Sequence, residues 1–297
     1  MNTTHTVHLV DASPYIFRAF FSIPASMTNP EGQSINAVYG FSAFLRLLVE
    51  KEGVTHIALT FDGSLTTSFR NDFYPEYKAQ RELPPEDLKA QLDACKAVGE
   101  AMGMATFIDS RYEADDLIAT LCRPLAAEGH RVVIVTSDKD LTQLVDERVS
   151  LFDFAKDERY GPAEVVEKFG VRPGQIADYL GLAGDSVDNI PGVKGVGKKT
   201  AVALLNALGS LEEIYQRLDA VPELPIRGAK SVARKLTDQR DMAELSKRLA
   251  TVADDAPASA GLEDLVLRER DTEALAALAE ALGFDPSRDR RRRSKNA

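Results

Sequence analysis

Four short runs rich in valine, leucine and isoleucine are each followed by acidic side chains. The runs are VHLV, HIALTF, ATFI and RVVIV, and they show little alternation between apolar and polar residues. Such runs are typical of parallel strands that are buried on both faces of a sheet. The acidic residues that follow them are Asp11, Asp62, Glu113, Asp115, Asp116, Asp138 and Asp140. Because ligands of open parallel sheets bind beyond the carboxyl ends of the strands, we expect these carboxylates to meet at one edge.

Helical segments separate these runs, and the alternation predicts an α/β fold. We expect a twisted, mainly parallel sheet with helices on both faces, occupying residues 1–161. The predicted strands lie near 6–11, 55–61, 104–108, 131–137 and 149–153, and the predicted helices near 14–21, 36–51, 84–102, 113–128 and 140–145.

Strand signals end near residue 162. Residues 162–284 read as a series of short helices, and residues 285–297 form a basic segment with four consecutive arginines. Charge runs at chain ends are usually solvated, so we expect this tail to be disordered.

A cluster of carboxylates raises the pKa of its members unless cations compensate the charge. Hard divalent cations such as Mg²⁺ prefer oxygen ligands. A two-metal site for phosphodiester hydrolysis is therefore the leading interpretation. Each acidic position has an ordinary alternative, since acidic residues favour helix starts, aspartate is common in turns, and Asp11 could cap the next helix. The prediction depends on finding all four strand ends together.

Between Asp62 and Pro84 the chain carries a polar stretch that is long for a strand-to-helix connection. This insertion, residues 63–84, interleaves basic residues with aromatic ones, a pattern expected of surfaces that bind single strands. Its basic residues are Arg70, Lys78 and Arg81, and its aromatic residues are Phe69, Phe73, Tyr74 and Tyr77. The alternative is a solvated surface loop.

The segment NIPGVKGVGKKTA predicts a glycine-rich turn that leads into a helix. Backbone N–H groups at a helix N-terminus, flanked by lysines, form a phosphate-binding site. A nucleotide-binding P-loop is the competing interpretation, but no apolar strand precedes the turn and Lys198 occupies the position of the required glycine. A helix-hairpin-helix at 189–205 that grips a DNA backbone fits better. Its predicted DNA contacts are Gly192, Lys194, Gly195, Gly197, Lys198 and Lys199.

The motifs LVDASPYIFRAF, FDG, FYPEYKAQR, YEADD, TSDKDLTQLV and GDSVDNIPGVKGVGKKTA resemble those of the bacterial 5′-3′ exonuclease and flap endonuclease family. That family includes the N-terminal nuclease region of bacterial DNA polymerase I. The resemblance runs from about residue 5 to residue 250. It implies a PIN-like fold with a helical arch and a helix-three-turn-helix element, in a free-standing nuclease because no polymerase region follows.

The resemblance also implies roles for individual residues. It places Asp11, Asp62, Glu113, Asp115, Asp116 and Asp138 in and around a first metal site, and Asp140, Asp185 and Asp188 at a second. Lys78 and Arg81 would be catalytic by steadying the scissile phosphate, Arg18 would lie near the same phosphate, and Tyr77 would stack on a base. The metals would be Mg²⁺ or Mn²⁺, two per site, and carbonyls of Ile190, Val193 and Val196 would hold K⁺.

Bulk composition is compatible with this interpretation. The net charge is −10, but setting nine metal-binding carboxylates aside leaves 37 acidic residues against 36 basic ones, so local basic patches decide binding. Two isolated cysteines make a disulfide framework or zinc site improbable, and no signal peptide or membrane-length apolar run is evident. We expect a cytoplasmic monomer that works on DNA beside a separate DNA polymerase.

Two rival functions remain at this point. A PIN-type ribonuclease shares the acidic edge but normally lacks the hairpin and the insertion. A catalytically silent binder of DNA junctions would have no use for nine clustered carboxylates.

Overall fold

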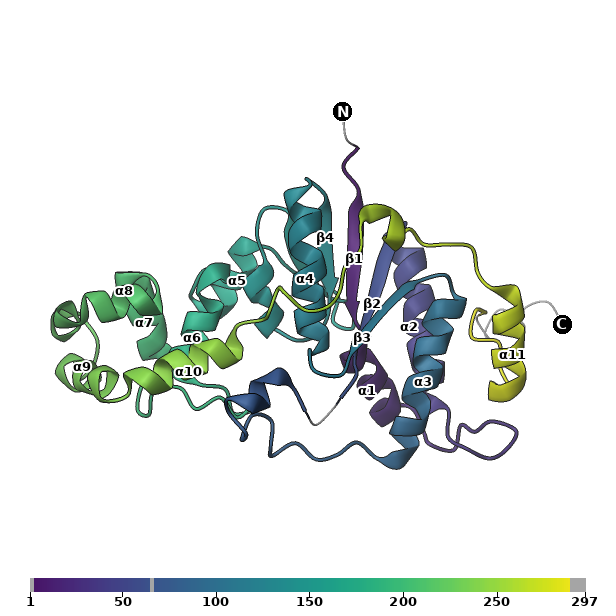
Figure 1. Ribbon diagram of the computed structural model, residues 1–297, viewed down its shortest axis with the longest axis horizontal. Helices are drawn as coiled ribbons and strands as arrows, with labels where there is room; N and C mark the ends of the chain where they lie inside the picture. Colours follow the sequence, from purple (N-terminus) through teal and green to yellow (C-terminus); the bar gives the residue numbers. More distant parts are fainter. Residues whose placement is uncertain (1–2, 65–66, 289–297) are drawn as a thin grey trace.

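The centre of the protein is a six-stranded sheet with strand order β3-β2-β1-β4-β5-β6 (Figure 1). The computed structural model describes residues 3–64 and 67–288. The first five strands are parallel, and β6 pairs antiparallel with β5. The strands are β1 (Thr6–Asp11), β2 (His56–Asp62), β3 (Ala105–Asp109), β4 (Arg131–Val135), β5 (Val149–Asp153) and β6 (Glu158–Tyr160). The predicted PIN-like α/β fold is confirmed, although β6 was not predicted.

Helices cover both faces of the sheet. One face packs against α1 (Ala12–Ser22), α2 (Asn36–Glu52) and α3 (Glu86–Ala101) through a core that includes Phe41, Leu45 and Leu48. The other face packs against α4 (Ala114–Ala127) and the helices that follow β6. Strand residues alternate between the two cores: Val7 and Leu9 belong to one, and Val10 to the other. Burial on both faces explains the continuous apolar runs in the sequence.

The connections leave β1 and β4 in opposite directions. After β1 the chain builds β2 and β3 on one side, and it then returns through α4 to start β4 on the other side of β1. The gap between the carboxyl ends of β1 and β4 is therefore the topological switch point, where ligands of open α/β sheets bind. Asp11 ends β1, and Asp138 follows β4.

A helical region extends to one side of the sheet (Figure 1). It comprises α5 (Pro162–Phe169), α6 (Ile176–Ala183), α7 (Lys198–Leu208), α8 (Leu211–Gln216), α9 (Ala229–Asp238) and α10 (Arg240–Ala250). The predicted helix-hairpin-helix is present: α6 and α7 flank a tight loop at 184–197. Within residues 3–64 and 67–288, no helix is both long and apolar enough to cross a membrane.

Two regions differ from the sequence prediction. The last helix, α11 (Thr272–Leu282), belongs to the predicted series of short helices but packs against α3, because the chain after α10 runs back across the sheet and bonds to its edge at Thr55 and Gly103. The insertion also contains no α-helix among its described residues 63–64 and 67–84; a 3₁₀ turn at Phe69–Asp72 is its helical part. The predicted basic tail lies from residue 289 onward outside the described residues.

Short 3₁₀ turns complete the structure and position some side chains used below. They span Phe69–Asp72, Asp140–Leu144, Pro173–Gln175, Leu218–Glu223 and Leu262–Leu265.

Candidate active site

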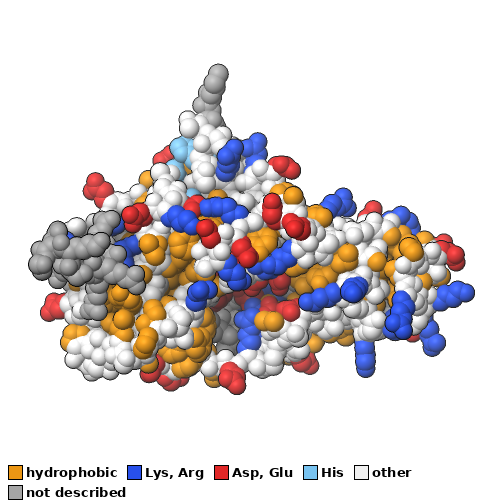
Figure 2. All heavy atoms as spheres, turned by 180° about the vertical axis from the view of Figure 1, so that it is seen from behind, with side chains coloured by type: hydrophobic (Ala, Val, Ile, Leu, Met, Phe, Trp, Pro, Cys, Tyr) orange, Lys and Arg blue, Asp and Glu red, His pale blue; other side chains and the backbone are white. Residues whose placement is uncertain are grey.

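The acidic side chains predicted from the sequence lie at the carboxyl edge of the sheet, in a hollow between the sheet and the helical region. Figure 2 shows acidic side chains in a hollow near the middle of one face, beside lysine and arginine side chains. Asp11 is buried at the end of β1 and accepts a hydrogen bond from Thr136 Oγ1 at 2.8 Å. Asp62 ends β2 and accepts from Ser13 Oγ at 2.6 Å and from the Ala114 N–H at 2.9 Å. These bonds aim both carboxylates across the strand ends.

Asp138 lies at the centre of the cluster. It contributes to raising the pKa of Asp11, Asp115 and Asp140, and its own pKa is raised chiefly by burial. Burial is the first cause for each of these groups, and the neighbouring carboxylates add to it. The pKa of Asp140 rises to about 8. The Asp138 carboxylate accepts a hydrogen bond from the Asp140 N–H at 2.9 Å.

A second acidic group forms around Asp140. Asp185 and Asp188, from the loop after α6, each bring a carboxylate oxygen into one group with Asp140, with these atoms all within 4.8 Å of one another. The structure therefore brings together the three residues predicted to serve a second metal. Their role as ligands stays a prediction.

Asp116, predicted to be a metal ligand, is bound to protein groups in this structure, and its role as a ligand stays a prediction. Its side chain is fully buried, and each of its oxygens accepts two hydrogen bonds. Both oxygens accept from the Arg70 guanidinium at 2.8 Å, and the remaining bonds come from the N–H groups of Glu113 and Ala253. A carboxylate with about four acceptor positions is saturated by these four bonds. Asp116 is thus a structural anchor, whereas Asp115, its neighbour, faces the acidic cluster.

Arg70 and Tyr77, which were predicted to contact DNA, are both buried in this structure, and DNA contact by either residue stays a prediction. Arg70 is 2% exposed and also donates to the carbonyls of Leu249 and Thr251, so it ties the insertion to α4 and to the end of α10. Tyr77 is 4% exposed, and its hydroxyl donates to Glu113 at 3.0 Å. Residues far apart in the sequence make these contacts, so local motifs did not reveal them.

Arg70→Ala should destabilise the protein by about 3 kcal/mol, because it leaves the buried Asp116 carboxylate without its partner. Arg111→Ala is the matched control: its ion pair with Asp72 is exposed, and exposed pairs contribute about 1 kcal/mol or less. Urea denaturation followed by fluorescence or circular dichroism measures both free energies of unfolding. Equal, small losses in the two variants would contradict the anchor role.

Two predicted catalytic cations reach the acidic cluster from the insertion. Lys78 Nζ lies 2.7 Å from Glu113 Oε1 and 3.5 Å from Asp188 Oδ2, and Arg81 Nη2 lies 2.5 Å from Asp188 Oδ1. The neighbouring carboxylates raise the pKa of Lys78, against the opposing effect of its burial. Both cations are therefore charged and stand at the rim of the hollow. Arg18 is exposed on α1.

The glycine loop before α7 presents its lysines to solvent. Lys194, Lys198 and Lys199 are exposed, while Val193 and Val196 are buried beneath them. Gly192 has a backbone φ of +61°, and a Cβ there would lie 2.3 Å from the Gly184 nitrogen, so the tight loop requires glycine. The carbonyls predicted to hold K⁺ include those of Ile190 and Val193, which accept backbone N–H bonds within the loop. Potassium binding stays a prediction.

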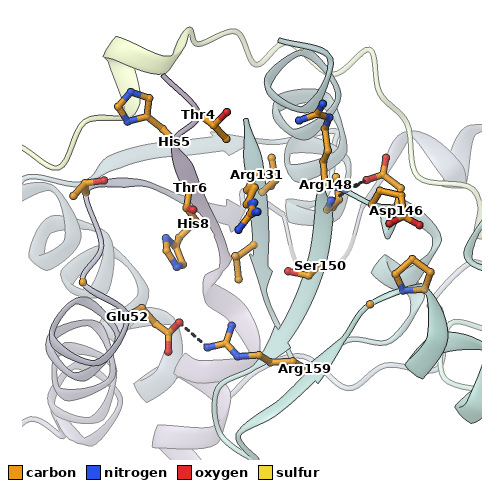
Figure 3. A pocket seen from close by; sticks show the side chains of 18 residues that line it. Thr4, His5, Thr6, His8, Glu52, Arg131, Asp146, Arg148, Ser150 and Arg159 are labelled. Atoms are coloured by element: carbon orange, nitrogen blue, oxygen red, sulfur yellow. Dashed lines mark hydrogen bonds and ion pairs between the residues drawn. The ribbon is translucent and has the colours of Figure 1, made fainter. Parts of the chain in front are cut away.

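A second hollow lies at the opposite end of the strands. It measures about 770 Å³ and opens at the amino ends of β1, β4 and β5 (Figure 3). Its charged groups satisfy one another in part: Arg159 pairs with Glu52 at 2.6 Å, and the backbone N–H of Arg148 donates to Asp146 at 2.7 Å. Because it lies at the amino ends of the strands, this hollow is separate from the acidic cluster, where the predicted reactive groups lie.

The donor set of the acidic cluster suits hard divalent cations. It offers carboxylate oxygens whose pKa values are raised by burial and, to a smaller extent, by the charges of neighbouring carboxylates. All four histidines lie in the first halves of β1 and β2 or just before β1 and β4, and both cysteines are buried in α3 and α4. Neither imidazole nor thiol is available to select zinc.

Two protein-family models together match residues 6–273, which contain the acidic cluster, the insertion and the glycine loop. Residues 6–170 match the 5′-3′ exonuclease N-terminal resolvase-like domain, and residues 171–273 match the 5′-3′ exonuclease C-terminal SAM fold. The chain belongs to the 5′-3′ exonuclease family. Members of this family are nucleases, so the predicted family, fold class and enzyme class are confirmed. The predicted domain limits stay predictions.

Relatives of this exonuclease-family chain are longer proteins. DNA polymerase I of Pseudomonas aeruginosa is 43% identical over 277 residues, which cover 93% of this chain and 30% of the polymerase. DNA polymerase I of Bacillus caldotenax is 39% identical over 281 residues, covering 93% and 31%. The chain thus spans about a third of the length of these curated relatives.

Solved structures share the fold of this family member. The T5 5′-exonuclease with bound zinc ions superimposes with a TM-score of 0.67 at 21% identity, covering 94% of this chain and all of that chain. The bacteriophage T5 D15 flap endonuclease, in a pseudo-enzyme-product complex with DNA and metal ions, gives a TM-score of 0.66 at 21% identity, covering 94% and 96%.

Proposed function

We propose that this chain is a metal-dependent 5′ nuclease that hydrolyses phosphodiester bonds in DNA, as a 5′-3′ exonuclease and a structure-specific 5′ flap endonuclease. Its place would be in replication or repair, where flaps or primers are removed. The observation that carries the proposal is that one hollow collects the acidic cluster, the two insertion cations and, beside it, the lysine-rich hairpin. The DNA and metal complexes of its structural neighbours support the same proposal.

The acidic residues would hold two divalent cations, Mg²⁺ or Mn²⁺. Asp11, Asp62, Glu113, Asp115 and Asp138 form the candidate first group, and Asp140, Asp185 and Asp188 the second. When bound, such cations supply a deprotonated water and stabilise the leaving oxygen in an in-line displacement. The hydroxyls of Ser13 and Thr136 orient two of the carboxylates, a role that sequence motifs did not reveal.

The remaining charged groups would bind the substrate. Lys78 and Arg81 would hold the scissile phosphate and offset the negative charge that develops on it. The hairpin lysines and the N-terminus of α7 would bind phosphates of the neighbouring duplex, with K⁺ as a further ligand of the loop. Contacts to phosphates position DNA without reading its sequence, so cleavage should depend on the shape of the junction. The products would carry a 5′-phosphate and a 3′-hydroxyl.

We place the chain in the cytoplasm as a monomer, acting beside a separate DNA polymerase. Cys95 and Cys122 are both unpaired and buried, in agreement with a reducing compartment.

A comparison of substrates tests the proposed function. With Mg²⁺, we expect a 5′ DNA flap to be cut at the junction, and nicked or gapped duplexes to lose nucleotides from the 5′ end. Single-stranded RNA of the same sequence should stay intact. Preferred cleavage of the RNA would instead support the PIN-type ribonuclease.

The thermal stability of the protein without DNA should depend on both pH and divalent metal, because both act on the acidic cluster. Burial and neighbouring carboxylates raise the folded-state pKa of Asp140 to about 8, above its ordinary value near 4. The folded protein therefore keeps protons that the unfolded chain releases, so the stability due to these groups falls as pH rises from about 4 to about 8. Divalent metal competes with those protons. We expect Mg²⁺ to raise the melting temperature more at about pH 8 than at about pH 5.

Differential scanning fluorimetry of EDTA-treated protein, with and without Mg²⁺, measures this effect. Asp140→Asn removes one titrating group and should reduce the pH dependence of the Mg²⁺ response. A response that is the same at both pH values would argue against a metal site built from these carboxylates.

A further inference from the structure

Part of the insertion lies along the loop that carries Asp185 and Asp188. We call residues 74–81 the strap and residues 185–189 the acidic loop. The Gln80 side-chain amide donates to the carbonyls of Ser186 at 3.1 Å and Val187 at 2.9 Å. The Asn189 amide donates in the other direction, to the Glu76 carbonyl at 2.6 Å. We propose that Gln80 and Asn189 are positioning residues that fix the acidic loop against the strap, a role that rests on the proposed function.

The backbone between these two contacts is held in an unusual conformation. Lys78 has a φ of +55°, which is uncommon for a residue with a long side chain, and its N–H donates to the Asp188 carbonyl at 3.1 Å. Asn189 has a φ of +58°, which asparagine tolerates better than most residues. Strained backbone persists where surrounding contacts impose it. The amide contacts of Gln80 and Asn189 lie on either side of this point and supply that constraint.

The acidic loop has supports at two places. Its own bonds join Asp185 to Ile190 through the backbone, and the Asp185 carboxylate accepts the N–H groups of Val187 and Asp188. These bonds shape the loop, and α6, which leads into it, packs against the 3₁₀ turn that carries Asp140. The strap supplies a second support, on the part of the loop that lies away from α6. Displacing reacting groups by about 1 Å can lower a rate by about 100-fold, so small shifts of this loop matter.

Gln239 provides a matched control in the same protein. Its side-chain amide makes the same kind of contact with the glycine hairpin: Oε1 accepts the Lys194 N–H at 2.8 Å, and Nε2 donates to the Lys194 carbonyl at 3.3 Å. It supports the proposed duplex-binding loop, not the acidic loop. Gln80→Ala and Gln239→Ala thus remove chemically equal groups from two different functional parts.

The experiment measures flap cleavage and metal binding for both variants. Gln80→Ala should lower kcat by about tenfold at limiting Mg²⁺ with KM nearly unchanged, and excess Mg²⁺ should restore most of the rate. Calorimetry without DNA should show weaker Mn²⁺ binding. Asn189→Gly, which keeps the positive φ accessible, should behave like Gln80→Ala. Gln239→Ala should raise KM for the flap and leave Mn²⁺ binding unchanged.

Two outcomes would overturn the proposal. One is unchanged kcat and Mn²⁺ affinity in Gln80→Ala and Asn189→Gly; the other is an equal loss in Gln239→Ala. If wild-type protein cleaves no flap, the proposed function fails, but the positioning role is still decided by Mn²⁺ affinity and by hydrogen exchange at the Lys78 amide. Faster exchange and weaker Mn²⁺ binding in Gln80→Ala support it, and unchanged values refute it.

Discussion

Asp138→Ala should lower flap cleavage by about 1,000-fold or more, while binding of the flap in Ca²⁺ stays nearly unchanged. Asp138 lies where the two acidic groups meet, because it raises the pKa of Asp11 and Asp115 on one side and of Asp140 on the other. Its loss removes a candidate ligand next to both groups. A change of this size corresponds to about 4 kcal/mol of transition-state stabilisation.

The same substitution should not unfold the protein. Burial, with a smaller contribution from the charge of Asp188, raises the pKa of Asp138, so its negative charge is unfavourable in the folded state and its removal should not destabilise the protein. Asp157→Asn, at an exposed aspartate of the β5–β6 turn that pairs with Lys51, is the control and should cleave like wild type. Single-turnover kinetics, binding by fluorescence anisotropy and a melting curve complete the measurement. Retained cleavage would remove Asp138 from the metal site.

Lys78→Ala should lower turnover by several hundred-fold and affinity for the flap by little. Lys78 is charged and is held at the rim of the hollow by Glu113 and Asp188, and its left-handed backbone is fixed by the Asp188 carbonyl. A cation placed in advance stabilises charge that develops only in the transition state, and removing one such donor typically costs 100- to 1,000-fold in kcat.

Lys89→Ala is the control for this prediction, since Lys89 is a partly exposed lysine of α3 that pairs with Glu86. Steady-state and single-turnover rates separate turnover from binding. If Lys78→Ala raises KM and leaves kcat unchanged, Lys78 binds substrate and transition state equally, and its catalytic role is wrong.

The sheet was predictable because its signal is local. The limits of β1 and β5 agree with the prediction, and the other three predicted strands differ by one or two residues. Continuous apolar runs record burial on both faces, and the carboxyl edge follows from parallel pairing. The β6 strand was missed because it has three residues and pairs antiparallel at the edge, which leaves too short a pattern.

The candidate site was predictable as a set of residues but not as a set of contacts. Glu113 and Asp116 are only three residues apart, yet Glu113 is the N-cap of α4 and faces the cluster, whereas Asp116 turns inward to Arg70. Arg70 contacts segments 46 and about 180 positions away in the chain. Such pairings form only in the packed fold. The sequence alone does not distinguish a charged residue that is buried with a partner from one that is exposed to solvent.

The central claim is that the acidic edge of the sheet, loaded with divalent metal, hydrolyses DNA. Metal-stripped protein mixed with a 5′-labelled flap, with Mg²⁺ then added, tests it most directly. We predict no cleavage before the addition and, after it, cleavage at the junction that leaves a 5′-phosphate on one product and a 3′-hydroxyl on the other. A protein that binds the flap tightly but leaves it intact in both Mg²⁺ and Mn²⁺ would contradict the claim and identify a junction binder.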